Sequence, residues 1–173
     1  MEALYAPFLD RMQNGAHILD AGCGSGRDTL NFLRRGYVVT AFDASKPLVE
    51  LASRLTGQEM LNLRFDEIEF DRTFDGIWAC ASLLHVARHD IDAVLDKLTR
   101  ALKPSGIMFV SFKLRDGEWE QSGRFFNGYD VASLGALLRR HQSLSIVSIW
   151  ESEDVRPERK GERWLNALLR RIA

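Results

Sequence analysis

Residues 18–26, Ile-Leu-Asp-Ala-Gly-Cys-Gly-Ser-Gly, place an acidic residue, Asp20, shortly before three alternating glycines. Glycine has no Cβ atom and readily adopts a positive φ, so such a stretch lets the backbone turn tightly and approach a ligand closely. Apolar residues precede Asp20, and helix-forming residues follow Gly26. This order predicts a strand, a tight turn and a helix, with Asp20 at the carboxyl end of the strand beside a crevice.

A second acidic residue, Asp43, follows a run of β-branched and aromatic residues over 37–42 that is typical of a strand buried on both faces. The carboxyl ends of neighbouring parallel strands open into one crevice, so Asp43 would reach the hydroxyl groups of a ribose bound across the glycine turn. The alternative is that Asp43 caps the next helix, but Ser45 already stands in the capping position ahead of Pro47. We therefore favour ligand binding for Asp43.

The glycine spacing departs from two other nucleotide-binding motifs. A dinucleotide-binding turn has the pattern G-x-G-x-x-G, and here Arg27 occupies the third position after Gly24. The P-loop pattern G-x-x-x-x-G-K-S/T is absent. A glycine-rich turn that binds no ligand remains the alternative on this motif alone.

The 173 residues suffice for one domain with a substantial core, and an apolar fraction of 46% with a charged fraction of 27% is ordinary for a soluble globular protein. The net charge of −1 gives no electrostatic argument for binding nucleic acid or an anionic membrane. Cys23 and Cys80 form no C-x-x-C pair, which argues against a zinc site or a disulfide framework. Neither a signal peptide nor a run of ~18 apolar residues is present. We expect a cytoplasmic protein with no metal and no membrane partner.

Alternating strand and helix patterns predict a doubly wound α/β domain that positions these residues. Strands are expected over 16–20, 37–42, 60–65, 74–79, 107–112, 144–150 and 164–169, although the last of these patterns also allows a helix. A short helix is expected within the N-terminal residues 1–15, and another over 46–55 that buries a stripe of Leu48, Leu51, Ala52 and Leu55. Residues 113–128 read as a long polar loop, and we interpret them as a candidate lid over a binding site.

The spacing Asp-x-Gly-x-Gly-x-Gly resembles the first motif of class I S-adenosylmethionine (SAM) methyltransferases, and the resemblance extends over about residues 16–170. Within that class the chain most resembles a bacterial group labelled as related to the tellurite-resistance methyltransferase, on residues 20–28, Asp43, 78–86, 123–126 and 154–157. The resemblance implies one domain over 1–173 with a Rossmann-like, seven-stranded, mostly parallel sheet whose last strand is antiparallel. It also implies SAM as cofactor and S-adenosylhomocysteine (SAH) as product.

In that family the glycine turn passes under the methionyl part of SAM, and the acid before it helps to hold the ammonium group. The cofactor-binding residues that the resemblance implies here are Asp20, Ala21, Gly22, Cys23, Gly24, Gly26, Asp43, Ala44, Phe65 and Ala79. For Phe65, packing on the adenine ring and packing in the core are both open.

The residues after the strand over 74–79 bear on the acceptor. Members that methylate bases or glutamine on nitrogen carry Asn/Asp-Pro-Pro-Tyr/Phe where this chain has Ala79-Cys80-Ala81-Ser82, which disfavours that chemistry. Cytosine C5 methylation needs a nucleophilic cysteine that follows a proline, whereas Cys80 follows Ala79. Cys80 therefore reads as a small buried residue beside SAM. His85 is the best candidate for a general base, the alternative being a histidine whose ring is satisfied by backbone groups.

Three basic residues, Lys113, Arg124 and Arg156, lie on strand ends or loops that could border the acceptor pocket. Arginine pairs well with anionic groups, although charged loops are usually only solvated. We expect methylation of a small molecule on O, N or S, with an anionic acceptor as one hypothesis. A nucleic-acid methyltransferase, which a basic face would indicate, and a SAM-binding protein without turnover are the alternatives. Relatives commonly carry another ~20 residues ahead of the first helix that cover the cofactor, whereas only residues 1–15 precede the first strand here. This difference keeps the second alternative open.

Overall fold

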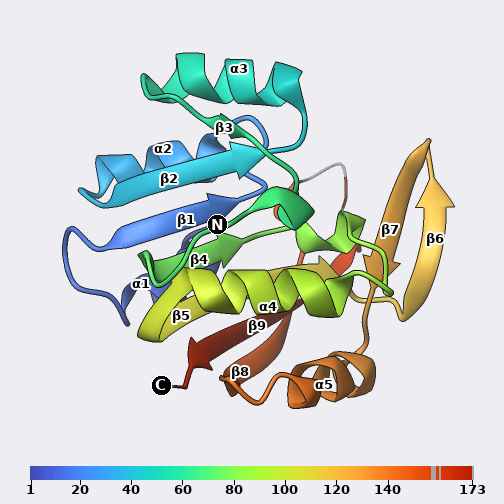
Figure 1. Cartoon of the computed structure of the whole chain (residues 1–173). Coiled ribbons are helices and arrows are strands. Elements are labelled where there is room, and N and C mark those ends of the chain that lie inside the picture. Colours follow the sequence, from blue (N-terminus) through green and yellow to red (C-terminus); the bar gives the residue numbers. More distant parts are fainter. Residues whose placement is uncertain (157–158, 160, 173) are drawn as a thin grey trace.

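The computed structural model describes residues 1–156, 159 and 161–172. In this part of the chain, seven strands form one sheet in the order β3-β2-β1-β4-β5-β9-β8 (Figure 1). These strands are β1 (His17–Ala21), β2 (Val38–Asp43), β3 (Leu61–Asn62), β4 (Phe74–Ala79), β5 (Leu102–Lys113), β8 (Leu144–Glu153) and β9 (Arg163–Arg171). Among the described strands of this sheet, only β9 runs antiparallel to its neighbours, β5 and β8. The predicted doubly wound fold with an antiparallel last strand is therefore confirmed.

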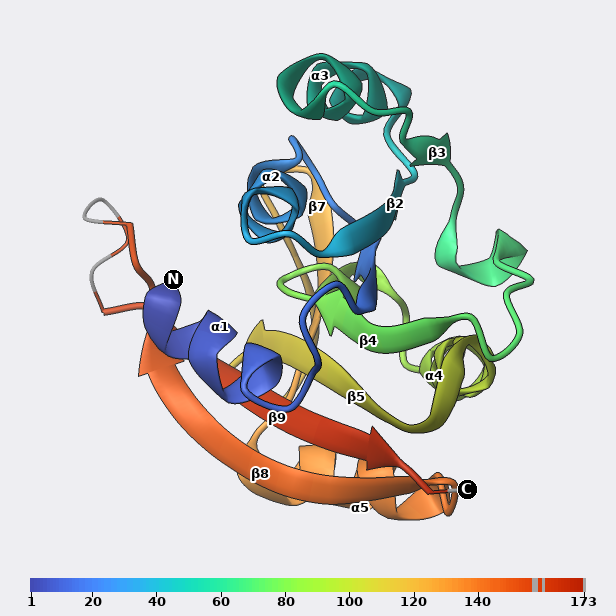
Figure 2. The same ribbon diagram turned by 90° about the vertical axis from the view of Figure 1, so that its left-hand side faces the viewer.

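Helices cover both faces of this sheet (Figure 2). They are α1 (Glu2–Leu9), α2 (Arg27–Arg34), α3 (Lys46–Thr56), α4 (Ile91–Ala101) and α5 (Val131–Arg140), with short 3-10 turns η1 (Phe65–Glu67) and η2 (Leu83–His85). Strand β4 buries apolar residues on both faces of the sheet: Trp78 packs with α1 and α2, whereas Ile77 and Ala79 belong to the opposite cluster that includes α4 and α5. No described helix is long and apolar enough to cross a membrane.

The prediction of a loop over residues 113–128 is wrong, because most of this segment forms an antiparallel hairpin. Strand β5 continues to Lys113, and β6 (Gly117–Gln121) pairs with β7 (Arg124–Gly128). Ser122 and Gly123 both have positive φ, 52° and 70°, which is the two-residue turn whose twist suits a hairpin. Trp119 stacks on Phe126 across the pair with ring centroids 5.4 Å apart. Figure 1 shows the hairpin projecting from the carboxyl ends of the strands.

The expected buried stripe of α3 also needs correction. Val49 and Ala52 are the buried residues of this helix, whereas Leu51 and Leu55 are 44% and 48% exposed. Helix α3 lies beside the two-residue strand β3 at the end of the sheet, where little of the sheet remains for it to cover (Figure 1). A small face around Ala52 therefore makes the contact, and two of the predicted leucines face solvent.

Candidate cofactor and acceptor site

A cavity of about 920 Å³ opens at the carboxyl ends of the strands. It lies at the point where the strand order reverses between β1 and β4, the usual ligand position in doubly wound sheets. The residues that line it include Gly22, Gly24, Asp43, Ala44, Phe65, Ala81, Ser82, His85, Arg124 and Phe125. The structure thus brings together the glycine turn, the acid that ends β2, the turn after β4 and the tip of the hairpin.

The three glycines of the turn have different neighbours. A Cβ atom added at Gly22 would lie 2.4 Å from the Cβ of Ser82, so a glycine lets the turn after β4 pack directly on this turn. One added at Gly26 would lie 2.9 Å from the Cβ of Ala52, so this glycine admits helix α3. At Gly24 an added Cβ meets nothing within 4 Å, although a φ of +56° still favours glycine there. Gly22 and Gly24 line the cavity, whereas Gly26 serves helix packing.

Asp43 connects the glycine turn with the start of α3. One carboxylate oxygen accepts a hydrogen bond from the backbone N–H of Gly24, and the other accepts one from Ser45, each at 2.9 Å. The Ser45 side chain makes no capping bond of its own. Asp43 therefore lines the cavity and also supports the helix start, which unites the two interpretations that its sequence position allowed.

Asp20 lies behind the cavity wall. Its side chain is only 2% exposed, it accepts a hydrogen bond from Thr29 Oγ1 at 2.6 Å, and it is absent from the cavity lining. Nearby, Asp28 accepts hydrogen bonds from the Tyr5 hydroxyl and from Trp78 Nε1, which tie α1 and β4 to α2. Burial, and then the negative charge of Asp28, raise the pKa of Asp20 well above its usual range.

Replacing this buried acid should change how stability depends on pH. The pKa of Asp20 is raised above the unfolded value of 3.8, so the folded state retains a proton that the unfolded chain loses. The contribution of Asp20 to stability is therefore lost as the pH rises through its folded pKa. Asp20→Asn mimics the protonated acid, so wild-type stability relative to this variant should fall by about 1–3 kcal/mol between pH 5 and pH 8.

Urea unfolding at the two pH values measures this difference. Asp10→Asn is the matched control, because Asp10 is exposed beyond the end of α1. A stability difference between the wild type and Asp20→Asn that stays constant with pH would contradict the raised pKa.

Several other predicted cofactor residues are packed behind the wall. Ala21 and Ala79 are fully buried, and Cys23 is 9% exposed; none of these side chains lines the cavity. The Cys80 thiol, which burial gives a pKa of about 12, stays protonated at neutral pH. The raised pKa disfavours Cys80 as a nucleophile, as predicted, although its side chain is half-buried rather than buried. Ala81 and Ser82 line the cavity and were missed, because neither residue type marks a special turn in the sequence.

His85 lines the cavity at η2 and is oriented by the hairpin. Its Nδ1 lies 2.7 Å from the carbonyl oxygen of Phe125, and its ring centroid lies 5.1 Å from that of Phe126. A carbonyl can only accept, so Nδ1 carries the proton and Nε2 keeps its lone pair in the neutral ring. The backbone contact expected under the alternative interpretation is present, and it leaves Nε2 available as a proton acceptor.

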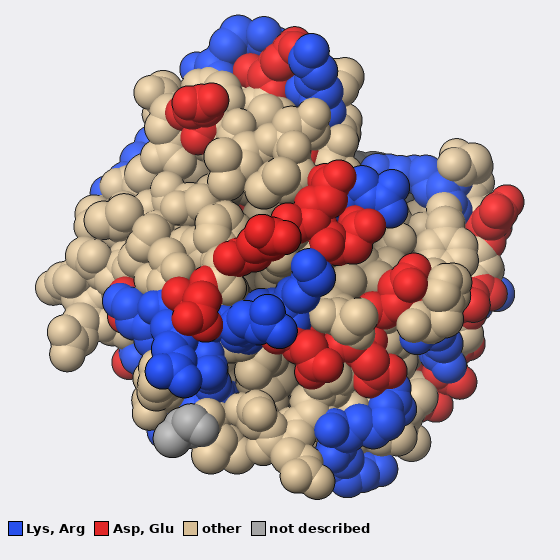
Figure 3. Space-filling view, viewed as in Figure 1, with Lys and Arg blue, Asp and Glu red and all other residues tan. Residues whose placement is uncertain are grey.

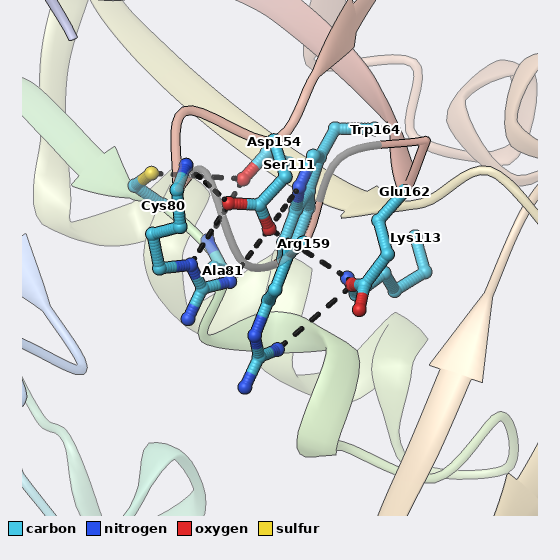
Figure 4. A network of polar contacts seen from close by, with 9 residues as sticks. Cys80, Ala81, Ser111, Lys113, Asp154, Arg159, Glu162 and Trp164 are labelled. Carbon is cyan, nitrogen blue, oxygen red and sulfur yellow. Dashed lines mark hydrogen bonds and ion pairs between the residues drawn. The ribbon is translucent and has the colours of Figure 1, made fainter.

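The three candidate acceptor-binding cations separate into two groups. Arg124 lines the cavity, and among the described residues its guanidinium forms no ion pair. Lys113 instead pairs with Glu162 and lies over the ring of Trp164, 4.2 Å from the centroid (Figure 4). Arg156 binds both oxygens of Asp154, at 2.8 and 2.6 Å. Neither Lys113 nor Arg156 lines the cavity.

Charge is intermixed on the face that carries α4. Figure 3 shows acidic and basic side chains side by side there, rather than the basic face that nucleic-acid binding would favour. Among the described residues, no group of three or more His, Cys, Asp and Glu side chains could hold a metal ion.

Glycines beside a cavity at the switch point, with an acid at the end of the next strand, define an α/β protein that binds a nucleotide-like ligand. The sequence profile of the methyltransferase domain family matches residues 18–106, just over half of the chain. The chain therefore belongs to this family.

Curated relatives resemble the chain over part of their length. The ubiquinone biosynthesis O-methyltransferase of Xylella fastidiosa is 37% identical over an alignment of 106 residues, which covers 57% of this chain and 42% of that protein. A putative methyltransferase of Bacillus subtilis is 30% identical over 110 residues, covering 57% and 44%. The chain thus spans less than half the length of these relatives.

Solved structures match almost the whole chain. The 1,6-didemethyltoxoflavin-N1-methyltransferase of Burkholderia thailandensis was solved with bound 1,6-didemethyltoxoflavin and SAH. Its structure has a TM-score of 0.85 at 25% identity, covering 99% of this chain and 77% of that one. A TehB-like SAM-dependent methyltransferase of Corynebacterium glutamicum has a TM-score of 0.73 at 24% identity, covering 96% and 86%. The second likeness shows a shared fold.

Proposed function

We propose that this chain transfers a methyl group from SAM to a small-molecule acceptor, with SAH as the product. The observation that carries the proposal is Asp43, which lines the cavity while its carboxylate holds the Gly24 N–H of the glycine turn. Membership of the methyltransferase domain family, and the SAH bound in the toxoflavin-related neighbour, support SAM as the cofactor. The names of that neighbour and of the ubiquinone relatives support a small acceptor.

The residues of the cavity fit such a cofactor. Asp43 would bind the ribose hydroxyls, and Gly22 and Gly24 would allow close approach of the methionyl part. Phe65 would pack on the adenine ring, since its own ring is held edge-on by Phe42 with centroids 5.2 Å apart. When bound, SAM supplies an electrophilic methyl group, so the protein mainly has to orient the acceptor and exclude water.

Two residues on the hairpin side of the cavity are assigned to the acceptor. His85 would accept the proton of an attacking hydroxyl or amine at Nε2, the nitrogen that its bond to Phe125 leaves free. Arg124 would bind an anionic group of the acceptor. The hairpin of β6 and β7 would shield this region from water, since Arg88 holds it through Asp116 and the Gly128 carbonyl.

We further infer that the chain groups with TehB-like methyltransferases. Residues 78–86 and the Corynebacterium glutamicum neighbour support this grouping. The inference concerns the group and does not extend to tellurium compounds as acceptors.

The test begins with calorimetric titration of SAH and SAM into the purified protein. Micromolar affinity, about −8 kcal/mol, is the expected result. A panel of phenols, amines and thiols, each in a neutral and a carboxylated form, is then assayed for SAH release. Binding without turnover on any acceptor would favour the SAM-binding alternative, and an absence of binding would contradict the proposal.

Arg124→Ala should raise KM for carboxylated acceptors by about 10- to 100-fold, because a charge-assisted pair contributes about 1.5–3 kcal/mol. Its affinity for SAH and its KM for neutral acceptors should change little. Steady-state kinetics on matched acceptor pairs measure the effect. Arg54→Ala is the control, because Arg54 is exposed on α3.

Arg156→Ala provides a contrast with Arg124→Ala, because Arg156 is another of the three basic residues predicted to border the acceptor pocket. Arg156 binds the carboxylate of Asp154, whose side chain is 2% exposed, so its loss should lower Tm rather than raise KM. A rise in KM for Arg156→Ala but not for Arg124→Ala would reverse the assignment.

A further inference from the structure

The turn after β4 has an unusual backbone conformation where it lines the cavity. Ala81 has a φ of +54°, in the left-handed region that residues other than glycine rarely adopt. Such a conformation persists only where its surroundings hold it in place, and it is often found at functional sites. Ala81 lines the cavity, so the shape of this turn is part of the wall that a ligand meets.

Ser111 holds this turn from the neighbouring strand β5. Its hydroxyl oxygen accepts a hydrogen bond from the backbone N–H of Ala81 at 2.8 Å, and the hydroxyl donates to Cys80 Sγ at 3.8 Å (Figure 4). One hydroxyl can fill both roles, since it has one proton and two lone pairs. Ser111 is 2% exposed and is not among the residues that line the cavity. Any effect of Ser111 on a ligand therefore passes through the turn.

Ser82 holds the same turn from the other side. Its hydroxyl donates to the carbonyl oxygen of Ala21, at the end of β1, at 2.6 Å. Its Cβ fills the space that a side chain at Gly22 would need, so the two turns are in direct contact. The turn over residues 80–82 is thus fixed to β1 by Ser82 and to β5 by Ser111.

We propose that Ser111 is a positioning residue of the site, which together with Ser82 keeps Ala81 in its left-handed conformation and so preforms the cavity wall. A wall that is already shaped needs no ordering when a ligand binds, which raises affinity without adding a contact. For SAM as the ligand, this inference rests on the proposed function. The conformation of the turn itself does not depend on the ligand.

Ser111→Ala is the first test, with SAH as the probe. The expected result is about tenfold weaker binding by calorimetry, because the Ala81 N–H loses its partner and the turn leaves its bound shape. Adding Ala81→Gly to Ser111→Ala should restore affinity to within about threefold, because glycine adopts a positive φ without strain. A merely structural role for Ser111 would lower Tm and would not be rescued by this glycine. Ser143→Ala, at an exposed position before β8, is the control.

Hydrogen exchange of the Ala81 amide, followed by NMR without ligand, tests the inference independently of SAM. The amide should be protected in the wild type and should exchange at least about tenfold faster in Ser111→Ala. Equal exchange in the two proteins would overturn the inference, as would unchanged SAH affinity in a Ser111→Ala protein whose wild type binds SAH. A wild type that binds no SAH but shows the exchange difference would contradict the proposed function and leave the positioning role of Ser111 in place.

Discussion

Replacing Asp43 with alanine is expected to weaken SAH binding by about 100-fold, which corresponds to about 2.7 kcal/mol. Removing the carboxylate would remove its proposed bonds to the ribose hydroxyls. It would also remove the hydrogen bonds that hold the Gly24 N–H and the start of α3. The glycine turn would then have to be ordered by the ligand. Calorimetry with SAH measures the loss, and thermal unfolding shows how much of it reflects the fold.

Two further variants separate the roles of Asp43. Asp43→Asn retains the shape and one accepting oxygen, so it should lose less affinity than the alanine variant. Asp10→Ala removes an exposed acid after α1 and should leave binding unchanged. Wild-type affinity in Asp43→Ala would remove the residue on which the assignment of the cofactor site depends.

His85→Ala is expected to lower kcat by about 10²–10⁴-fold on phenol and amine acceptors, the range that general base catalysis contributes. The loss should be smaller for thiols, which ionise more readily near neutral pH and need less help from a base. The affinity for SAH should stay within about threefold of the wild type, a change of less than about 1 kcal/mol.

His89→Ala is the matched control for this experiment. His89 lies four residues further on, with a side chain that is 79% exposed beside Asp90 and outside the cavity lining. Equal kcat values for the wild type and His85→Ala on every hydroxyl and amine acceptor would exclude His85 as the base.

Much of the fold could be predicted because its signals are local. Strand β4 lies at its predicted bounds, Phe74–Ala79, since Phe74 and the apolar run from Ile77 to Ala79 mark a strand that is buried on both faces. The glycine turn and Asp43 were located because glycine spacing and a strand end are features of the sequence itself. Their placement in one cavity then follows from the parallel order of β1 and β2.

The hairpin of β6 and β7 differs from the predicted loop because a polar composition predicts a loop, whereas the residue pattern of the segment predicts a hairpin. The segment is polar, but Ser122-Gly123 lies between two five-residue runs, and Trp119 and Phe126 fall opposite each other in the pairing. Those features were available in the sequence. The prediction that the leucine stripe of α3 is buried is wrong for another reason. Periodicity identifies one face of a helix, but it does not indicate how much of the sheet lies beneath that face.

The acceptor side of the site depends on contacts between distant residues, which the sequence does not reveal. Lys113 and Arg156 lie near strand ends as expected, but each meets a carboxylate, Glu162 and Asp154 respectively. Arg124 has none among the described residues, and only the three-dimensional structure distinguishes it from the other two. The sequence likewise gives no sign of the left-handed conformation of Ala81, since the hydrogen bond that holds it comes from Ser111, 30 residues away.

The position of β9 has a consequence for the order in which the protein can assemble during synthesis. β9 lies between β5 and β8, although it follows both in the chain, so until β9 is made β8 has no partner and β5 pairs only with β4. Until residues 163–171 emerge, β5 presents an open edge flanked by Phe109 and Phe112, which the finished fold buries completely. Open apolar edges are the surfaces through which unfinished chains associate with one another or with chaperones. We therefore expect nascent chains that stop before Arg163 to be the forms most prone to aggregation, whereas addition of β9 closes the β5 edge and gives β8 its partner in one step.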